Sequence, residues 1–182
     1  MIASADGPGR RWCAPSKSMC IRRRANRNRP SATRSTQRAR KRVKKMHDIE
    51  FFDHTADIGF RLQRPSQKEL FRDAAFAMFH IIEPDTDYHD LVNYEIAADG
   101  HDLEELMVNW LSELNFTFQT QGYVPLNIRL TFAAQSLTAV IQGYAVNRTV
   151  RNSQVEIKAV TYHRIYVRQE AGVWTTQVIF DI

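Results

Sequence analysis

The sequence predicts an α+β fold in which two helices pack on one face of a largely antiparallel sheet. Two segments combine a helix-capping signal with apolar residues at helical spacing. A long region after Pro125 is rich in Val, Ile, Thr, Tyr and Phe, which favour strands. Helices and strands alternate first and strands alone follow, an order typical of helices gathered on one side of an antiparallel sheet.

Charge divides the chain into two unlike parts. Residues 1–45 hold 15 of the 25 Lys and Arg and one acid, Asp6, which gives this segment a charge of about +14. Residues 46–182 hold 10 Lys and Arg against 19 Asp and Glu, a net charge of −9. The basic segment lacks periodic Val, Ile and Leu, so we expect it to be a disordered extension. Three interpretations remain open: an arm that attracts RNA, a transit peptide, or a wrongly assigned start of the gene whose true start codon encodes Met46.

The acidic part, residues 46–182, has the length of a single domain and can bury a core of its own. Both cysteines, Cys13 and Cys20, lie in the basic segment, so no thiol is available in the domain for a disulfide, a zinc site or a nucleophile. No apolar run approaches the length of a bilayer span. We therefore expect a protein that is soluble and cytoplasmic, with no membrane partner.

The first strand is predicted around residues 52–62, where apolar and polar residues alternate. Read as one continuous strand, the segment presents an apolar face made of Phe52, His54, Ala56, Ile58, Phe60 and Leu62. Its polar face then holds Asp53, Thr55, Asp57 and Arg61. Two carboxylates, Asp53 and Asp57, are therefore expected to share a face.

Two helices are predicted from capping residues at their N-termini. Ser66 and Glu69 form a capping box after Pro65, and apolar residues continue at helical spacing, which predicts a helix over 66–82. Asp102 begins a second such signal, and the apolar stripe that follows extends through Phe118. The stripe includes Trp110, which we expect in the core.

The remaining elements are predicted to be strands. Their expected ranges are 91–98, 126–133, 136–146, 155–168 and 173–181. Glu170, Ala171 and Gly172 form a short hairpin connection, which makes the last two strands antiparallel neighbours. In the final strand, alternation directs Asp181 away from the apolar face. The α-carboxylate of Ile182 then lies one residue from the Asp181 carboxylate, and both can reach one cation.

These acidic groups favour a hard divalent cation such as Ca²⁺, Mg²⁺ or Mn²⁺, because such ions prefer oxygen ligands. Clustered carboxylates repel one another, and a bound cation offsets that repulsion. A soft-metal site is not expected, since the domain has no Cys.

Three motifs in this order resemble the archease family. They are Asp53–Gly59 (DHTADIG), Glu156–His163 (EIKAVTYH) and the terminal Asp181-Ile182. The resemblance covers essentially all of 46–182 and leaves the basic segment outside. It implies an accessory protein of the tRNA-splicing RNA ligase, which promotes the GTP-dependent guanylylation of the ligase and its multiple turnover, and which is not itself an enzyme.

The resemblance also implies the site. The metal ligands are expected to be Asp57, Asp181 and the terminal carboxylate of Ile182, with Ca²⁺ as the usual ion in the family and Mg²⁺ or Mn²⁺ as alternatives. Four further residues are candidates for supporting or partner-facing roles: Asp53, His54, Lys158 and His163. His54 falls on the apolar side of the predicted strand, where a hydrogen-bonded core histidine is the alternative interpretation.

One departure from the family pattern lies in segment 144–154, which lacks a Glu and a His that the family commonly carries there. It concerns contacts with the partner rather than the metal site. The charge of −9 leads us to expect a protein partner and no direct RNA binding by the acidic domain. Two other functions remain open: a stand-alone metal-dependent phosphoester hydrolase, and a general chaperone or interaction module.

Overall fold

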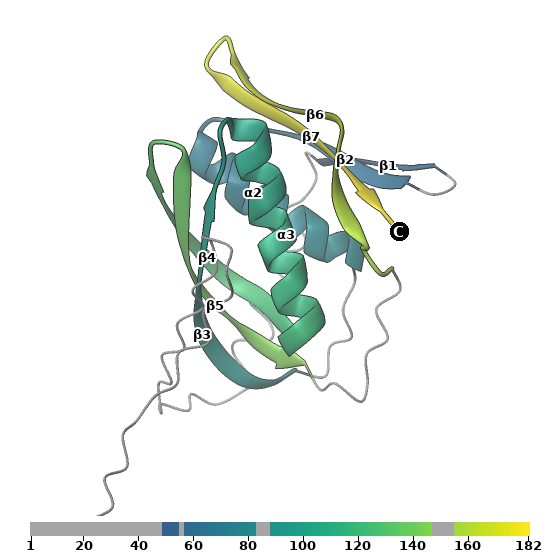
Figure 1. Cartoon of the computed structure of the whole chain (residues 1–182), viewed down its shortest axis with the longest axis vertical. Helices are drawn as coiled ribbons and strands as arrows, with labels where there is room; N and C mark the ends of the chain where they lie inside the picture. The colour runs from purple at the N-terminus through teal and green to yellow at the C-terminus, as the bar shows by residue number, and fades with distance from the viewer. Residues whose placement is uncertain (1–48, 55–56, 83–87, 147–154) are drawn as a thin grey trace, which may run out of the picture.

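The computed structural model describes residues 49–54, 57–82, 88–146 and 155–182 (Figure 1). The predictions for residues 1–45 and for most of segment 144–154 lie outside the described residues. The elements in chain order are β1 (Ile49–His54), β2 (Asp57–Arg64), α2 (Gln67–Ile82), β3 (Tyr88–Asp99), α3 (Leu103–Gln121), β4 (Tyr123–Ala133), β5 (Ser136–Val146), β6 (Ala159–Glu170) and β7 (Val173–Asp181).

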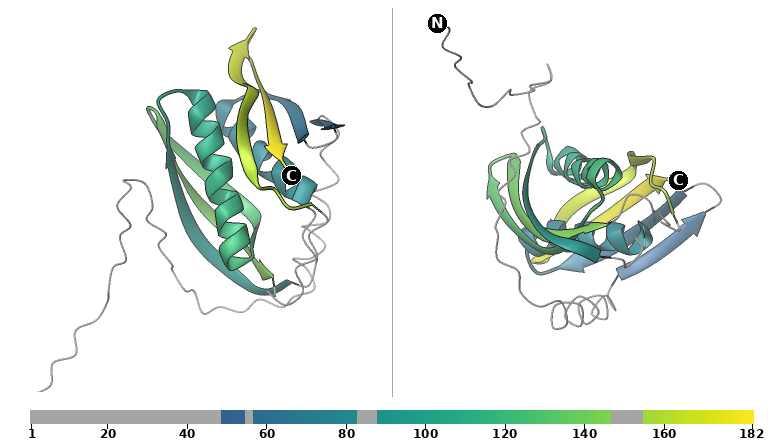
Figure 2. Two further views of the ribbon diagram at one scale, coloured as in Figure 1. Left: turned by 45° about the vertical axis from the view of Figure 1, so that its right-hand side comes forward. Right: turned by 90° about the horizontal axis from the view of Figure 1, so that it is seen from below.

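The strands form two antiparallel sheets rather than a single sheet. One has four strands in the order β1-β2-β7-β6, and the other has three strands in the order β3-β5-β4. Helix α2 packs against β2 and β7 of the first sheet and β4 of the second, while α3 packs against β6 and β3 (Figure 2). The predicted α+β class is confirmed, and each helix contacts both sheets.

Both helices begin where their capping signals predict. The Ser66 hydroxyl accepts a hydrogen bond from the Glu69 backbone N–H at 3.2 Å and donates one to the Glu69 carboxylate at 3.1 Å, so Ser66 caps the start of α2. The Asp102 carboxylate accepts from the Glu105 backbone N–H at 2.8 Å and caps α3. Helix α3 ends at Gly122, whose φ of 71° is the left-handed conformation that glycine adopts without strain.

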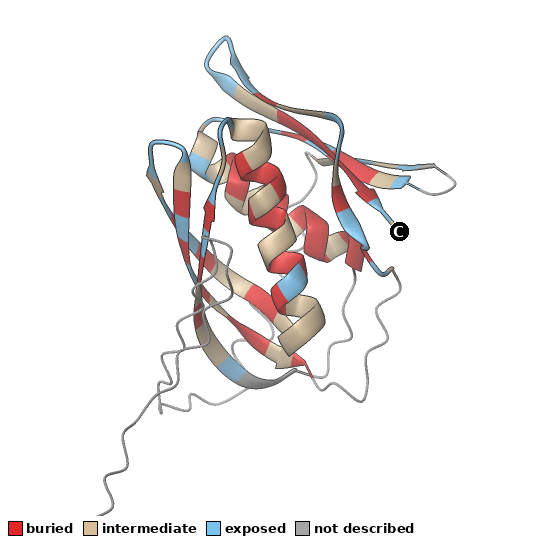
Figure 3. Cartoon of the chain, in the orientation of Figure 1, coloured by how far each residue is buried: buried red, intermediate tan, exposed pale blue. Residues whose placement is uncertain are grey.

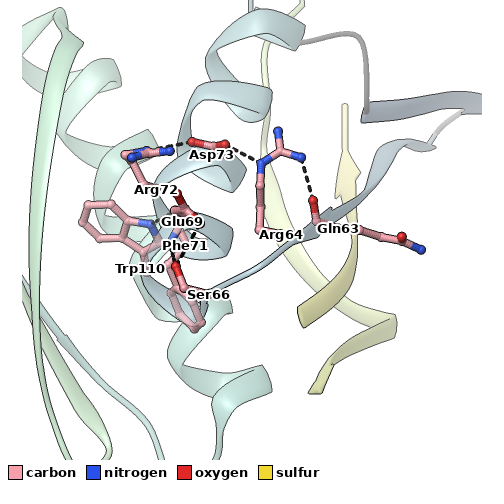
Figure 4. Close-up of polar contacts among 8 residues, drawn as sticks. All are labelled: Gln63, Arg64, Ser66, Glu69, Phe71, Arg72, Asp73 and Trp110. Carbon is pink, nitrogen blue, oxygen red and sulfur yellow. Dashed lines mark hydrogen bonds and ion pairs between the residues drawn. The ribbon is translucent and has the colours of Figure 1, made fainter. Parts of the chain in front are cut away.

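The core lies where the helices meet the two sheets, and buried residues line the inner faces of α2 and α3 (Figure 3). Trp110 is fully buried, as expected, and its indole N–H donates to the Phe71 carbonyl of α2 at 3.0 Å (Figure 4). Asp73 of α2 accepts from Arg64 at 2.5 Å and from Arg72 at 2.8 Å, one guanidinium on each carboxylate oxygen. These contacts fix α2 against α3 and against the end of β2.

The prediction of one continuous strand over 52–62 is wrong. The chain reverses between His54 and Asp57, and β1 pairs with β2 in the register Phe52 to Gly59 and Phe51 to Phe60. Phe52 therefore lies on the opposite face from the fully buried Phe60. The sequence does not indicate this reversal. The alternation of apolar and polar residues continues through residues 55–56, and neither residue is a Gly, Pro, Asn or Asp.

The C-terminal hairpin agrees with the sequence. Strand β7 spans the predicted 173–181, and the Ala171 and Gly172 turn residues have φ values of 49° and 81°. Strand β6 differs, because it starts at Ala159 and its pairing with β7 shifts register between Thr161 and Tyr166. Among the described residues, no helix is long and apolar enough to cross a membrane.

The Trp110 contact predicts a large stability loss on substitution. Trp110→Phe removes the hydrogen bond to a buried helix carbonyl and leaves a small cavity, so we expect the free energy of unfolding to fall by about 2–4 kcal/mol. Urea denaturation followed by circular dichroism measures this change. Phe116→Ala on the same helix is the matched control, because Phe116 is 41% exposed, and a loss there as large as that of Trp110→Phe would contradict the assignment.

Candidate functional site

Asp57 and Asp181 lie directly opposite each other. Asp57 is the first residue of β2 and Asp181 the last of β7, and the two are register partners in the antiparallel β2–β7 pair. Side chains of such partners lie on the same face of the sheet, with Cβ atoms about 4.5–5.5 Å apart. Both residues are exposed. Two carboxylates separated by more than a hundred positions in the sequence are thus brought together by strand pairing alone.

The end of the chain is held in place. Ile182 is partly buried and packs against the core, which fits the predicted alternation, since Thr176, Val178 and Phe180 on its side of β7 are also buried. The Lys158 backbone N–H donates to the Asp181 carbonyl at 2.8 Å, and the Lys158 ammonium donates to the Ile182 terminal oxygen at 2.9 Å. The terminal carboxylate is therefore fixed beside Asp181.

The charges at this site are unbalanced in a way that suits a cation. Like charges on directly opposed strand residues are unfavourable, and the Lys158 ammonium contacts the chain end. In the described ranges, no three side chains of His, Cys, Asp or Glu form a cluster that would hold a metal. With the terminal carboxylate of Ile182, the two aspartates would form an all-oxygen donor set, which fits a hard divalent ion.

The other predicted residues divide into two groups. Asp53 pairs with Ile58 in the β1–β2 ladder, so it lies on the opposite face from Asp57, and the expectation that the two acids share a face is wrong. The reason is the chain reversal before Asp57. His54 is the backbone register partner of Asp57, and its side chain lies outside the described part of the structure.

His163 lies in the β6 irregularity, together with residues that the sequence analysis missed. It lines a cavity with Asp57 and with Phe52, Arg61, Arg164, Gln177 and Ile179. The prediction treated 155–168 as a regular strand, in which no local signal marks a bulge. Hydrogen bonds of Gln177 link lining residues that lie far apart in the sequence, and such contacts leave no periodic pattern in it.

Tyr162 belongs to the same irregular segment but is oriented toward α3. Partial burial first, and the carboxylates of Glu105 and Asp102 second, raise the pKa of its hydroxyl. The side chain is 59% exposed. It therefore lies near the acidic N-terminus of α3 and does not line the cavity.

Comparison with known proteins gives consistent results. Residues 49–182 match the model of the Archease protein family (MTH1598/TM1083). The chain is 36% identical over 138 residues to the Protein archease of Methanosarcina barkeri, a match that covers 73% of this chain and 94% of that protein. It is 30% identical over 139 residues to the Protein archease of Saccharolobus islandicus, covering 75% of this chain and all of the relative.

Solved structures agree. The solution structure of Methanobacterium thermoautotrophicum protein 1598 matches with a TM-score of 0.56 and 29% identity, over 74% of this chain and 98% of that one. A Thermotoga maritima crystal structure, described as an archease and possible chaperone, matches with a TM-score of 0.52 and 21% identity, over 72% and 94% of the two chains, and supports the fold alone. From the family match and the relatives together, we conclude that this chain belongs to the archease family.

Proposed function

We propose that this protein is a metal-dependent accessory factor of the tRNA-splicing RNA ligase in the cytoplasm, and that it is not itself the ligase. In this proposal it promotes the GTP-dependent guanylylation of the ligase and allows repeated turnover. The observation that carries the proposal is the register of β2 and β7, because it places Asp57 beside Asp181 at the end of the chain. Membership of the archease family supports it.

The cation would be held by Asp57, Asp181 and the terminal carboxylate of Ile182. Once bound, it would supply positive charge to phosphate oxygens of the ligase reaction. The protein's own residues position that charge: the β2–β7 ladder sets the separation of the two aspartates, and Lys158 holds one oxygen of the chain end. Ca²⁺ suits a set of exposed carboxylate oxygens, and Mg²⁺ or Mn²⁺ would compete for the same ligands.

Metal binding tests the donor set directly. We expect Asp57→Asn and Asp181→Asn each to weaken Ca²⁺ binding by about tenfold or more, because each removes a charged oxygen ligand from a small site. Isothermal titration calorimetry of the purified full chain measures the dissociation constants. Asp53→Asn is the matched control: it also removes one acid near the site, but Asp53 lies on the other face of the sheet. Equal affinities for all four proteins would refute the assignment.

Activation of the ligase tests the function. The assay contains the cognate ligase, GTP and labelled substrate. The wild-type protein should stimulate guanylylation and multiple turnover of the ligase. Asp57→Ala should lose most of that stimulation, because the cation is no longer held. Asp53→Ala should behave as the wild type does. The readout is the amount of guanylylated ligase formed over time.

Other outcomes of the same assay point to other functions. Turnover of RNA or nucleotides by the protein alone, with metal and without ligase, would indicate a phosphoester hydrolase. Stimulation that is fully retained in Asp57→Ala would indicate a chaperone-like role that does not use the site, and the site assignment would then be wrong.

A further inference from the structure

The cavity beside Asp57 lies on the outer, solvent-facing side of the four-stranded sheet. It has a volume of about 370 Å³ and is lined from all four strands. Phe52 comes from β1, Asp57 and Arg61 from β2, Gln177 and Ile179 from β7, and His163 and Arg164 from β6. Asp57 is shared with the candidate metal site, so the two features are continuous.

A buried glutamine builds this cavity. Gln177 is 5% exposed, although it lies on the outer side of β7. Its carbonyl oxygen accepts from the Arg61 Nε–H at 2.5 Å, and its amide nitrogen donates to the Arg164 carbonyl at 2.9 Å. We call these two hydrogen bonds the Gln177 clamp. They join β2 to the irregular segment of β6 across β7, and they explain why a polar side chain is buried on this face.

The clamp fixes an unusual backbone. Arg164 has a φ of 52°, a left-handed conformation that is uncommon for residues other than glycine, in the stretch where β6 loses register with β7. Bulges of this kind redirect side chains, and they are over-represented beside functional sites. Here the bulge brings His163 and Arg164 to the cavity opposite Arg61.

The cavity is lined by two arginines, although the domain as a whole carries a net negative charge. The Arg61 guanidinium is half exposed, lies 5.2 Å from the centre of the Phe52 ring and makes only a long, exposed contact of 3.4 Å to Glu50. Within the described ranges, the Arg164 guanidinium forms no ion pair with a carboxylate. Arg61 and Arg164 therefore line the same cavity as His163 and as Asp57, which is a candidate cation ligand.

We propose that this cavity binds the terminal phosphate monoester of a ribonucleotide, with its oxygens shared between the two guanidinium groups and a cation at Asp57. Guanidinium groups pair with phosphate in a planar, two-pronged geometry. A phosphate monoester has enough oxygens to contact arginines and a cation at once. The inference rests on the proposed function for the cation at Asp57.

The inference limits where RNA can bind. The net charge of −9 over residues 46–182 disfavours contact along a nucleic-acid backbone. Recognition is therefore confined to one terminal phosphate at the cavity. The same chemistry is offered by the 3′-phosphate end of an RNA and by a free nucleotide.

Fluorescence anisotropy with the full chain tests this inference. The probes are two labelled five-nucleotide RNAs, identical except that one ends in a 3′-phosphate and the other in a 3′-hydroxyl, in Ca²⁺ and 0.15 M salt. We expect the wild type to prefer the 3′-phosphate by about tenfold, and Arg164→Gln to reduce that preference to about twofold or less. Arg61→Gln is a second variant with the same expectation, and the thermal transition confirms that each variant is folded.

Arg129→Gln is the matched control, because Arg129 is an exposed arginine on β4 of the other sheet. It should keep the full preference. The basic segment 1–45 is present in every protein compared, so it cannot create a difference between variants. Equal binding of the two RNAs by the wild type, or an unchanged preference in both Arg61→Gln and Arg164→Gln, would overturn the inference.

Competition identifies the source of the phosphate. Displacement by unlabelled 3′-phosphorylated RNA but not by guanosine monophosphate assigns the cavity to RNA ends, and equal displacement assigns it to nucleotides; either result supports a phosphate monoester. A wild-type protein that stimulates guanylylation but shows no phosphate preference refutes this inference alone. One that prefers the phosphate but stimulates no ligase refutes the proposed function alone.

Discussion

The antiparallel pairing of β2 with β7 is the interaction on which the site depends. Its register makes Asp57 and Asp181 direct partners and, by the same alternation, buries Phe60, Val178 and Phe180 on the other side. A shift of one residue would place the aspartates in the core and the apolar residues in water. The hydrophobic core therefore selects the register, and the register brings the two carboxylates together. Stability and the candidate cation site are consequences of the same pairing.

Two unlike environments meet on the outer face of this sheet. The chain end concentrates negative charge from two aspartates and a terminal carboxylate, with Lys158 beside it. A few residues away, the Gln177 clamp holds Arg61 and the backbone of Arg164 at one cavity. Both depend on β7, which pairs with β2 on one side and with β6 on the other. The proposed cation and the proposed phosphate would therefore be neighbours on this face of the sheet.

Features that depend on residues close together in the sequence were predicted correctly. Ser66 and Asp102 cap their helices through their own side chains and backbone groups three residues away, so a short window contains the whole interaction. The hairpin before β7 was equally local. The split of the first strand was missed because no turn-forming residue marks positions 55–56. The β6 bulge was missed because Arg164 adopts its left-handed conformation under a hydrogen bond from Gln177, thirteen residues away and on another strand.

The sequence by itself determined the α+β class, the positions of both helices and the polar side of β7, because periodicity and capping act over a few residues. It also supplied the motifs that resemble the archease family, and the family match confirms them. Only the tertiary structure decided that the strands form two sheets, that Asp53 lies away from Asp57, and that Phe52, Arg61, Arg164 and Gln177 form a cavity beside it. Those features arise from pairing between strands far apart in the chain, and such pairing is set by packing of the whole core.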